Sequence, residues 1–362
     1  MRGPAFGLGS GAAWLRAVLA CAAVAAATTA PALERIDLYR VVVEPVDGSQ
    51  AEIVQRAMER LLVRVTGSTS APYAPDLAPL IADASNPRYV NSSGTDPVTR
   101  EPFVVFNSTN IERELTRLQW PVWGSERPLT LAWIVVENAF GERAFVGAVT
   151  PEGTSEDMAA LIESVRNDLE LVAEERGLPI ELPLYDIEDL NAAPMNEVFG
   201  FFEEPVVAAS RRYGADAVLL GRVRAGDFPE VSWLLVMDGS RDGIPASYTV
   251  REGLDAVANT FAARFAPVGA ATPVRLTVLD IESGDDFGRV LAAVRGLSDV
   301  RAVSVVSAAG DTLVLEAATR GGAEQLERVL ALTGSLVPDS GVAGSSPRWP
   351  ASSEGLVFRV RR

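Results

Sequence analysis

The sequence of 362 residues contains no histidine and no lysine, so every positive charge is carried by arginine. Without histidine the chain has no imidazole base, no serine–histidine–aspartate triad and no histidine ligand for a metal. Without lysine it has neither a Schiff-base amine nor the lysine of a phosphate-binding loop. Carboxylates, hydroxyl groups and arginine remain, and we assign no catalytic, cofactor-binding or metal-binding residue and expect no cofactor.

Cysteine is almost as scarce, because Cys21 is the only one. It lies in an N-terminal leader, so we expect neither disulfides nor a thiolate site in the rest of the chain. Long apolar runs are also missing after the leader, since no later stretch reaches the roughly 18 residues that a membrane span needs. We therefore expect no transmembrane span in the mature chain.

Acidic residues outnumber basic ones by 48 to 32, which gives a formal net charge of −16. Such a chain is repelled by phosphate backbones and anionic lipid headgroups, so a nucleic-acid partner is not expected. Hydrophobic residues make up 48% of the chain, enough to bury a core in two or three domains. These features predict an acidic, soluble, multidomain protein.

Residues 1–32 are typical of a secretory signal peptide. Arg2 and Arg16 supply positive charge, residues 17–29 form an apolar run of small residues, and Ala30–Ala32 reads as a cleavage site. The alternative is a lipoprotein leader in which Cys21 is the lipidated residue. The leader predicts a periplasmic protein of the cell envelope.

The remaining chain divides by pattern into α/β (α+β) units with mixed sheets and helices on their faces. We expect an N-terminal unit over 33–125, a central domain over 126–266 and a linker over 267–273. After the linker the order strand-helix-strand-strand-helix predicts a C-terminal ferredoxin-like βαββαβ domain over 274–362, with its last strand at Leu356–Val360. Its residues 338–355 are expected to form a flexible loop.

The stretch Arg211–Val223, "RRYGADAVLLGRV", predicts a helix that ends at Gly214 and leads directly into a strand. A phosphate-binding turn would need a glycine-rich passage from strand to helix, which is the opposite order. We therefore interpret this stretch as a structural joint, in which Gly221 permits the close approach of a neighbouring element.

The segment "WPVWGSERP" is the best candidate for an interaction surface. Trp120, Trp123 and Arg127 are of the types that anchor interfaces, and the turn-rich segment precedes a buried-looking strand. The alternative interpretation is that both tryptophans fill the seam between the first two units, while Arg127 pairs with a carboxylate.

The acidic loop at Asp186, Glu188 and Asp189 follows a strand. Paired carboxylates can act as acid and base or hold a hard cation. Their spacing does not match a calcium loop, however, and no second cluster completes a site. We interpret the loop as a solvated turn or helix cap.

Four separated stretches, "LVRVTGS", "WPVWGSERPLTLAWIVVE", "RGLPIELPLYDIED" and "RRYGADAVLLGRV", carry a family resemblance. In them the chain resembles an uncharacterised proteobacterial envelope family, domain of unknown function 2066 (DUF2066). The resemblance implies an exported envelope protein and brings no catalytic residues. The last stretch is also loosely similar to a joint in small envelope binding domains, such as the N-terminal domain of the Tol translocation protein and the lipoprotein activators of penicillin-binding proteins.

Together these observations predict an exported, non-enzymatic binding or scaffold protein with an envelope protein as its partner. One alternative is a hydrolase that uses two carboxylates on an envelope glycan. A second is a purely structural assembly factor, which would expose a large apolar patch and oligomerise. The sequence leaves the oligomeric state open.

Overall fold

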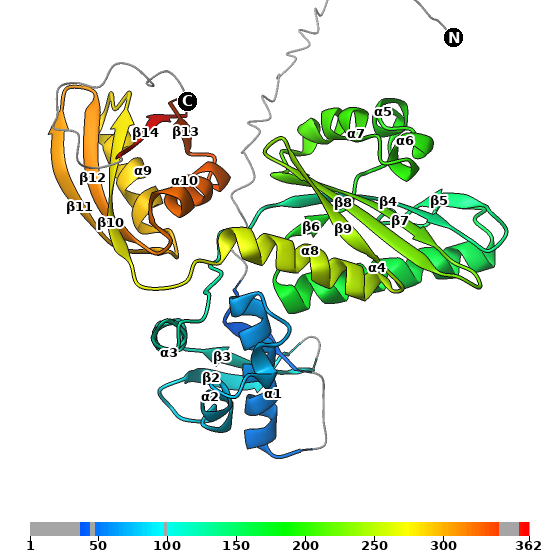
Figure 1. The fold of residues 1–362 in the computed structure, drawn as a ribbon, viewed down its shortest axis with the longest axis horizontal. Helices are drawn as coiled ribbons and strands as arrows, with labels where there is room; N and C mark the ends of the chain where they lie inside the picture. The colour runs from blue at the N-terminus through cyan, green and yellow to red at the C-terminus, as the bar shows by residue number, and fades with distance from the viewer. Residues whose placement is uncertain (1–36, 44–47, 98–99, 340–354, 362) are drawn as a thin grey trace, which may run out of the picture. The chain divides into compact units, whose positions relative to one another are not determined.

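The computed structural model describes residues 37–43, 48–97, 100–339 and 355–361, all within one compact unit, Arg35–Arg362 (Figure 1). The described residues form three sheets, each with helices beside it. This confirms the mixed α/β class that the sequence predicts. The expected signal peptide over 1–32, including Cys21, lies outside the described residues.

The first sheet has the strand order β1-β3-β2, with antiparallel pairing throughout. Its main helix, α1, starts at Ser49, whose side chain forms a capping box with Glu52, and ends at Gly67 in the left-handed conformation. The elements are β1 (Arg40–Val42), α1 (Gln50–Thr66), a 3-10 turn (Ala71–Tyr73), α2 (Ala78–Ala82), β2 (Val90–Thr95), β3 (Pro102–Phe106) and α3 (Ser108–Arg117).

The central sheet has the order β5-β4-β7-β8-β9, with the short β6 beside β4. β4 and β7 are parallel, whereas β7, β8 and β9 form an antiparallel meander. The elements are β4 (Thr130–Glu137), β5 (Arg143–Phe145), α4 (Glu156–Arg176), β6 (Ile180–Glu181), α5 (Ile187–Ala192), α6 (Met195–Phe199), α7 (Glu203–Ser210), β7 (Ala217–Arg224), β8 (Glu230–Met237), β9 (Ser240–Ser247) and α8 (Val250–Phe265).

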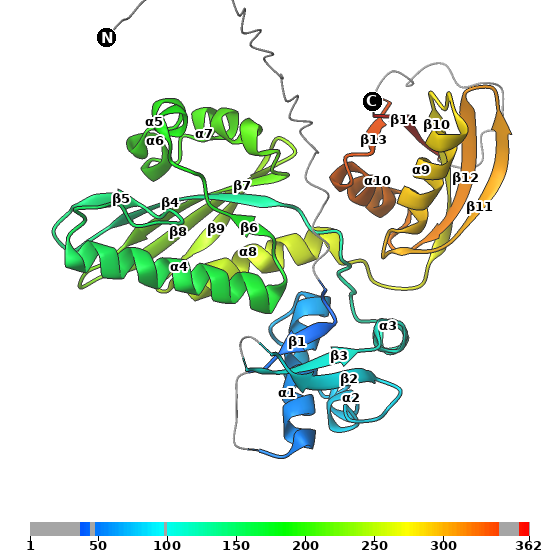
Figure 2. The same cartoon turned by 180° about the vertical axis from the view of Figure 1, so that it is seen from behind.

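Helices cover both faces of this central sheet, as Figures 1 and 2 show. α4 and α8 pack on one face, where Trp233 and Phe261 join a large apolar core. The short helices α5, α6 and α7 pack on the other face around Trp133. Because both faces are covered, β4 contains the uninterrupted apolar run "LAWIVV".

The joint at Arg211–Val223 has the predicted structure. A single 3-10 turn (Arg211–Tyr213) follows α7, Gly214 adopts the left-handed conformation at φ 65°, and β7 begins three residues later. Gly221 lies opposite Trp233 of β8, and the indole ring occupies the space that a side chain at Gly221 would need. The neighbouring element that approaches Gly221 closely is therefore the Trp233 ring of β8.

The C-terminal sheet has five strands in the order β11-β12-β10-β14-β13. Its last strand, β14, lies beside β10 but runs parallel to it, whereas the last strand of a ferredoxin-like unit runs antiparallel to the first. β13, which pairs antiparallel with β14, was not predicted from the sequence. The elements are β10 (Thr272–Leu279), α9 (Gly284–Arg295), β11 (Val300–Ala309), β12 (Thr312–Thr319), α10 (Gly322–Leu332), β13 (Leu336–Pro338) and β14 (Gly355–Val360).

The expected loop over 338–355 falls mostly on residues 340–354, which lie outside the described residues. Pro338 ends β13 and Gly355 begins β14, so both ends of that range belong to strands. The β10 strand begins at Thr272, inside the range expected for the linker.

We predict that Gly221→Ala lowers the free energy of unfolding by about 1–3 kcal/mol, because its Cβ would meet the Trp233 ring at 2.2 Å. Urea unfolding followed by circular dichroism measures the change. Gly243→Ala is the matched control, since Gly243 lies in β9 of the same sheet and has open space around it. Equal effects of the two substitutions would contradict the packing argument.

Candidate functional site

The three residues expected to form an interaction surface do not lie on one surface. Trp123 and Arg127 are each only 1% exposed, whereas Trp120 is partly exposed and donates its indole N–H to Asp76 at 2.8 Å. A partner could not reach Trp123 or Arg127 in this structure. The indole ring and the guanidinium stack on each other in the interior, where the donors of Arg127 find acceptors and the indole N–H of Trp123 has no hydrogen-bond partner among the described residues.

Arg127 finds its acceptors among backbone carbonyls, not at a carboxylate. Its Nε donates to the Gly124 carbonyl at 3.0 Å and its Nη2 to the Arg64 carbonyl at 2.8 Å, while its Nη1 donates to the carbonyl of Arg176. The guanidinium also stacks 3.9 Å from the centre of the Trp123 ring. Burial lowers the pKa of Arg127 well below its usual value, yet a guanidinium stays charged in proteins.

Two further buried arginines complete this arrangement, which we call the arginine network (Arg64, Arg127 and Arg176). Arg64, on α1, donates to the Glu174 carbonyl at 2.9 Å near the end of α4. Arg176, at the end of α4, donates to the Gly67 carbonyl at 2.7 Å at the end of α1. The last carbonyls of a helix lack partners and carry partial negative charge. Each helix therefore supplies a cation to the carbonyl end of the other.

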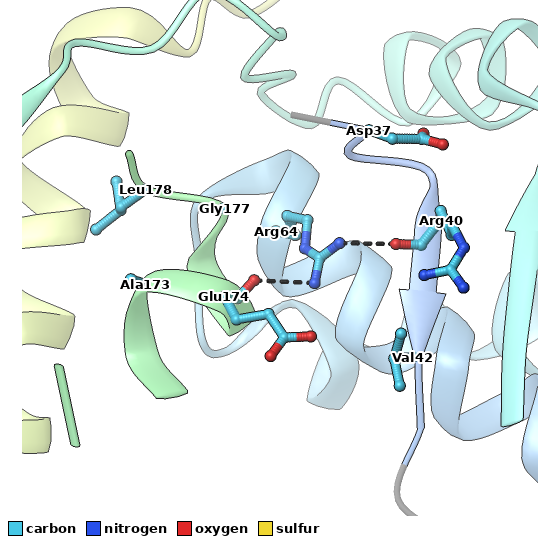
Figure 3. Close-up of a pocket in the computed structure, with 8 residues that line it drawn as sticks. All are labelled: Asp37, Arg40, Val42, Arg64, Ala173, Glu174, Gly177 and Leu178. Atoms are coloured by element: carbon cyan, nitrogen blue, oxygen red, sulfur yellow. Dashed lines mark hydrogen bonds between the residues drawn. The ribbon is translucent and has the colours of Figure 1, made fainter. Parts of the chain in front are cut away.

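A hollow of about 300 Å³ lies beside Arg64 (Figure 3). The Nη atoms of Arg64 bind the carbonyls of Arg40 and Glu174, so this guanidinium joins β1 to the end of α4 instead of facing a ligand. Arg40 pairs with Asp96 at 2.7 Å. The hollow is lined by Asp37, Arg40, Val42, Arg64, Ala173, Glu174, Gly177 and Leu178.

The acidic loop is tied into the helix joint. Asp186 caps α5 by accepting the N–H of Asp189 at 3.0 Å, and it accepts two hydrogen bonds from Arg212 at 2.7 and 3.0 Å. These hydrogen bonds from Arg212 lower the pKa of Asp186 to about 2. Asp189 is fully buried and accepts from the Tyr185 N–H at 2.9 Å and from the Tyr213 hydroxyl. These contacts fit the helix-cap interpretation.

The end of the central sheet where β4 and β7 finish carries three arginines around one ring. The guanidinium carbon of Arg143 lies 3.6 Å from the Phe199 ring centre, and those of Arg224 and Arg222 lie at 5.2 and 5.5 Å. Glu137 accepts from Arg143 at 2.6 Å, and Glu230 contacts Arg222 at 3.3 Å. Arginine is thereby concentrated on this end of an acidic protein, with its side chains held in place by rings and carboxylates.

Two hairpin loops project from the same end of the sheet. Phe140 lies in the β4–β5 loop and is 80% exposed, and Phe228 lies in the β7–β8 loop and is 92% exposed. The loops are neighbours, because the Ala225 N–H donates to the Glu137 carbonyl at 2.8 Å. We call Phe140, Phe228 and the arginines around Phe199 the loop end.

Sequence reasoning missed the loop end. A signal was present, since the turns "NAFGE" and "AGDFP" each place a phenylalanine among turn-forming residues between two strands. An aromatic residue at such a position has no core to enter. Loops at the carboxyl ends of parallel strands are also where α/β sheets commonly bind ligands.

A second buried polar cluster surrounds Asp299. Its carboxylate accepts from Arg320 at 3.0 Å and from Gln325 at 2.9 Å. Burial raises the pKa of Asp299 to about 6, because loss of water outweighs the attraction of Arg320. Nearby, Glu112 of α3 accepts from Tyr39 at 2.7 Å and pairs with Arg301.

Two findings concern the described residues alone. None of their helices is long and apolar enough to cross a membrane. In the same part of the chain, no group of three or more acidic, histidine or cysteine side chains is arranged to hold a metal ion.

We predict that Arg127→Lys lowers the free energy of unfolding by about 2–4 kcal/mol. A single ammonium cannot reach the carbonyls of Gly124, Arg64 and Arg176 together or stack as a plane on Trp123. Arg241→Lys, at an exposed salt bridge with Glu203, should cost less than about 0.5 kcal/mol. Chemical denaturation measures the free energy of unfolding of both variants. Equal decreases in the two variants would contradict a special role for the Arg127 guanidinium.

We predict a pH dependence from Asp299. Its pKa is higher in the folded chain than in the unfolded chain, so its stabilising contribution is present at low pH and is lost as the pH rises through about 6. The free energy of unfolding of the wild type should fall by about 2 kcal/mol from this group between roughly pH 4 and 7, and Asp299→Asn should not show this fall. Thermal unfolding across this range tests it, with Asp227→Asn in the exposed β7–β8 loop as control. Parallel pH curves for wild type and Asp299→Asn would show the prediction to be wrong.

Comparison with known proteins gives one family match. Residues 32–124 match the family model described as Domain of unknown function (DUF8605). The expected resemblance to domain of unknown function 2066 is therefore wrong, because the matching family is a different one. The match covers the "LVRVTGS" stretch but ends within "WPVWGSERPLTLAWIVVE", and it does not reach the two later stretches.

Among solved structures, the chain is similar to "LpoB C-terminal domain from Salmonella enterica (Sel-Met)" at 14% sequence identity and a TM-score of 0.18. The likeness covers 34% of this chain and 83% of that chain. At this score it carries no inference about fold or function. None of the curated proteins compared with the chain matches it.

Proposed function

We propose that this protein is a non-enzymatic binding protein of the cell envelope and that its loop end holds a protein partner. The observation that carries the proposal is the pair of exposed phenylalanines, Phe140 and Phe228, beside the arginines that surround Phe199. Aromatic residues and arginine dominate the energetics of protein interfaces. The envelope location rests on the leader sequence.

The loop end is prepared for binding by its rigid base. Asn138 accepts the N–H groups of Phe140 and Glu142, both at 3.0 Å, which fixes the β4–β5 loop. The arginines are held by Glu137 and Glu230, so little side-chain freedom is lost on binding. The three arginines are matched by four carboxylates in the same loops and strand ends, at Glu137, Glu142, Asp227 and Glu230, so the loop end carries no excess of positive charge. We infer that the partner presents an apolar surface to Phe140 and Phe228.

The hydrolase alternative gains no specific support. Its natural starting point is the acidic loop, but a general acid needs a raised pKa, and Arg212 lowers that of Asp186 to about 2. Asp189 is buried and already accepts from Tyr185 and Tyr213. Release of reducing sugars from peptidoglycan by the purified chain would speak against the proposal.

The direct test places a photo-crosslinking amino acid at position 228 of the full chain in the cell, with position 73 as the control. Tyr73 is also an exposed aromatic residue, but it lies in the 3-10 turn that follows α1 and not in the central sheet. We expect one protein to be crosslinked from position 228 and not from position 73. Equal crosslinking from both positions, or from neither, would overturn the proposal.

The recovered partner is then purified and its affinity measured by calorimetry. The double variant Phe140→Ser/Phe228→Ser should weaken binding by about tenfold or more, as expected when interface anchors are lost. Tyr73→Ser removes an exposed aromatic ring beside the first sheet and should leave the affinity unchanged. A partner that binds the double variant and Tyr73→Ser equally well does not use the loop end.

A further inference from the structure

β11 is a long edge strand with an open side. It pairs with β12 alone among the described residues and forms one edge of the C-terminal sheet (Figure 1). From Ser304 to Ala309 every residue is exposed. Exposed edges of this kind present unpaired N–H and carbonyl groups that can pair with another strand.

Three other sheet edges are guarded in recognised ways, whereas β2, at an edge of the first sheet, is uncharged but has only six residues. β13, at the opposite edge of the same sheet, has three residues and ends at Pro338. β9 carries Arg241, Asp242 and Pro245. β5 has three residues, of which Arg143 is charged. Charges, proline and shortness all discourage edge-to-edge pairing. By contrast, β11 has ten residues, and none from Ala302 to Ala309 is charged or proline. Its pairing with β12 is irregular at Arg301 and at Val306, so the strand is bent at these two positions.

We propose that β11 pairs antiparallel with β11 of a second copy of this chain, around a two-fold axis near Val306. Two chains of net charge −16 repel each other, so close contact is favourable only where the surface is uncharged. β11 offers eight consecutive uncharged residues for this contact. The pairing would join two five-stranded sheets and cover the exposed Val305 and Val306.

Charge complementarity favours pairing about Val306. Arg301 and Asp311 lie five positions before and five positions after Val306. In an antiparallel pair centred on Val306, Arg301 of one copy therefore lies near the β11–β12 turn of the other, which contains Asp311, and the symmetry produces this contact twice. Arg301 already contacts Glu112 of its own chain, but it remains partly exposed and a guanidinium has five donors. A two-fold interface of this kind is self-complementary and closed, so it forms a dimer and not a fibre.

The test is the oligomeric state of the full chain by analytical ultracentrifugation over about a hundredfold range of concentration. We expect a dimer whose dissociation constant rises about tenfold or more in Val306→Lys and in Asp311→Arg. Val337→Lys is the matched control, because Val337 lies on the opposite edge of the same sheet and is 45% exposed, against 50% for Val306. Circular dichroism of each variant confirms that its fold is intact.

A chain that is monomeric at every concentration overturns the proposal, as does a dimer that either Val306→Lys or Asp311→Arg leaves unchanged. Loss of the dimer in Val337→Lys to the same extent would also contradict it, because that residue is outside the proposed interface. None of these substitutions lies in the loop end, so this proposal and the proposed function stand or fall separately.

Discussion

Buried guanidinium groups that bind helix-terminal carbonyls are the interaction on which the first two sheets depend. Arg64 and Arg176 each donate to the end of the other's helix, and Arg127 donates to the carbonyls of both arginines. Three buried cations close together would be costly without acceptors. Here carbonyls at two helix ends supply acceptors, and Arg176 also binds the side chains of Asp255 and Asn259. The planar shape of the group lets one side chain reach several carbonyls. A chain whose only cation is arginine is well suited to this arrangement.

This network explains why the tryptophan-rich segment is not a binding surface. Arg127 stacks on Trp123, and both are enclosed where the ends of α1 and α4 meet. With that segment committed to the interior, exposed aromatic residues of the central sheet are found at the loop end. There Phe140 and Phe228 extend from hairpins whose bases are fixed by hydrogen bonds and ion pairs. The central sheet thus has a rigidly packed arginine network at one end and the accessible loop end at the other.

The sequence predicted local structure well, because local signals determine it. The amphipathic pattern before Gly177 marks α4, and Tyr213–Gly214 marks the joint into β7. It failed where distant residues decide the outcome. The direction of β14 depends on pairing with β10, about 80 residues earlier. Residue type alone could not tell a buried Arg127 from an exposed anchor, since arginine and tryptophan serve in both roles. Phe140 was overlooked because its exposure depends on where the hairpin ends.

The most direct measurement of the central claim is native-state hydrogen exchange of the wild-type chain in increasing denaturant. If guanidinium groups unite the ends of α1 and α4, the last-turn amides of the two helices should share one opening free energy and one dependence on denaturant. Peptides ending at Thr66 and at Arg176 report on the two helix ends separately. Opening of α1 at much lower denaturant, with α4 still protected, would contradict the account.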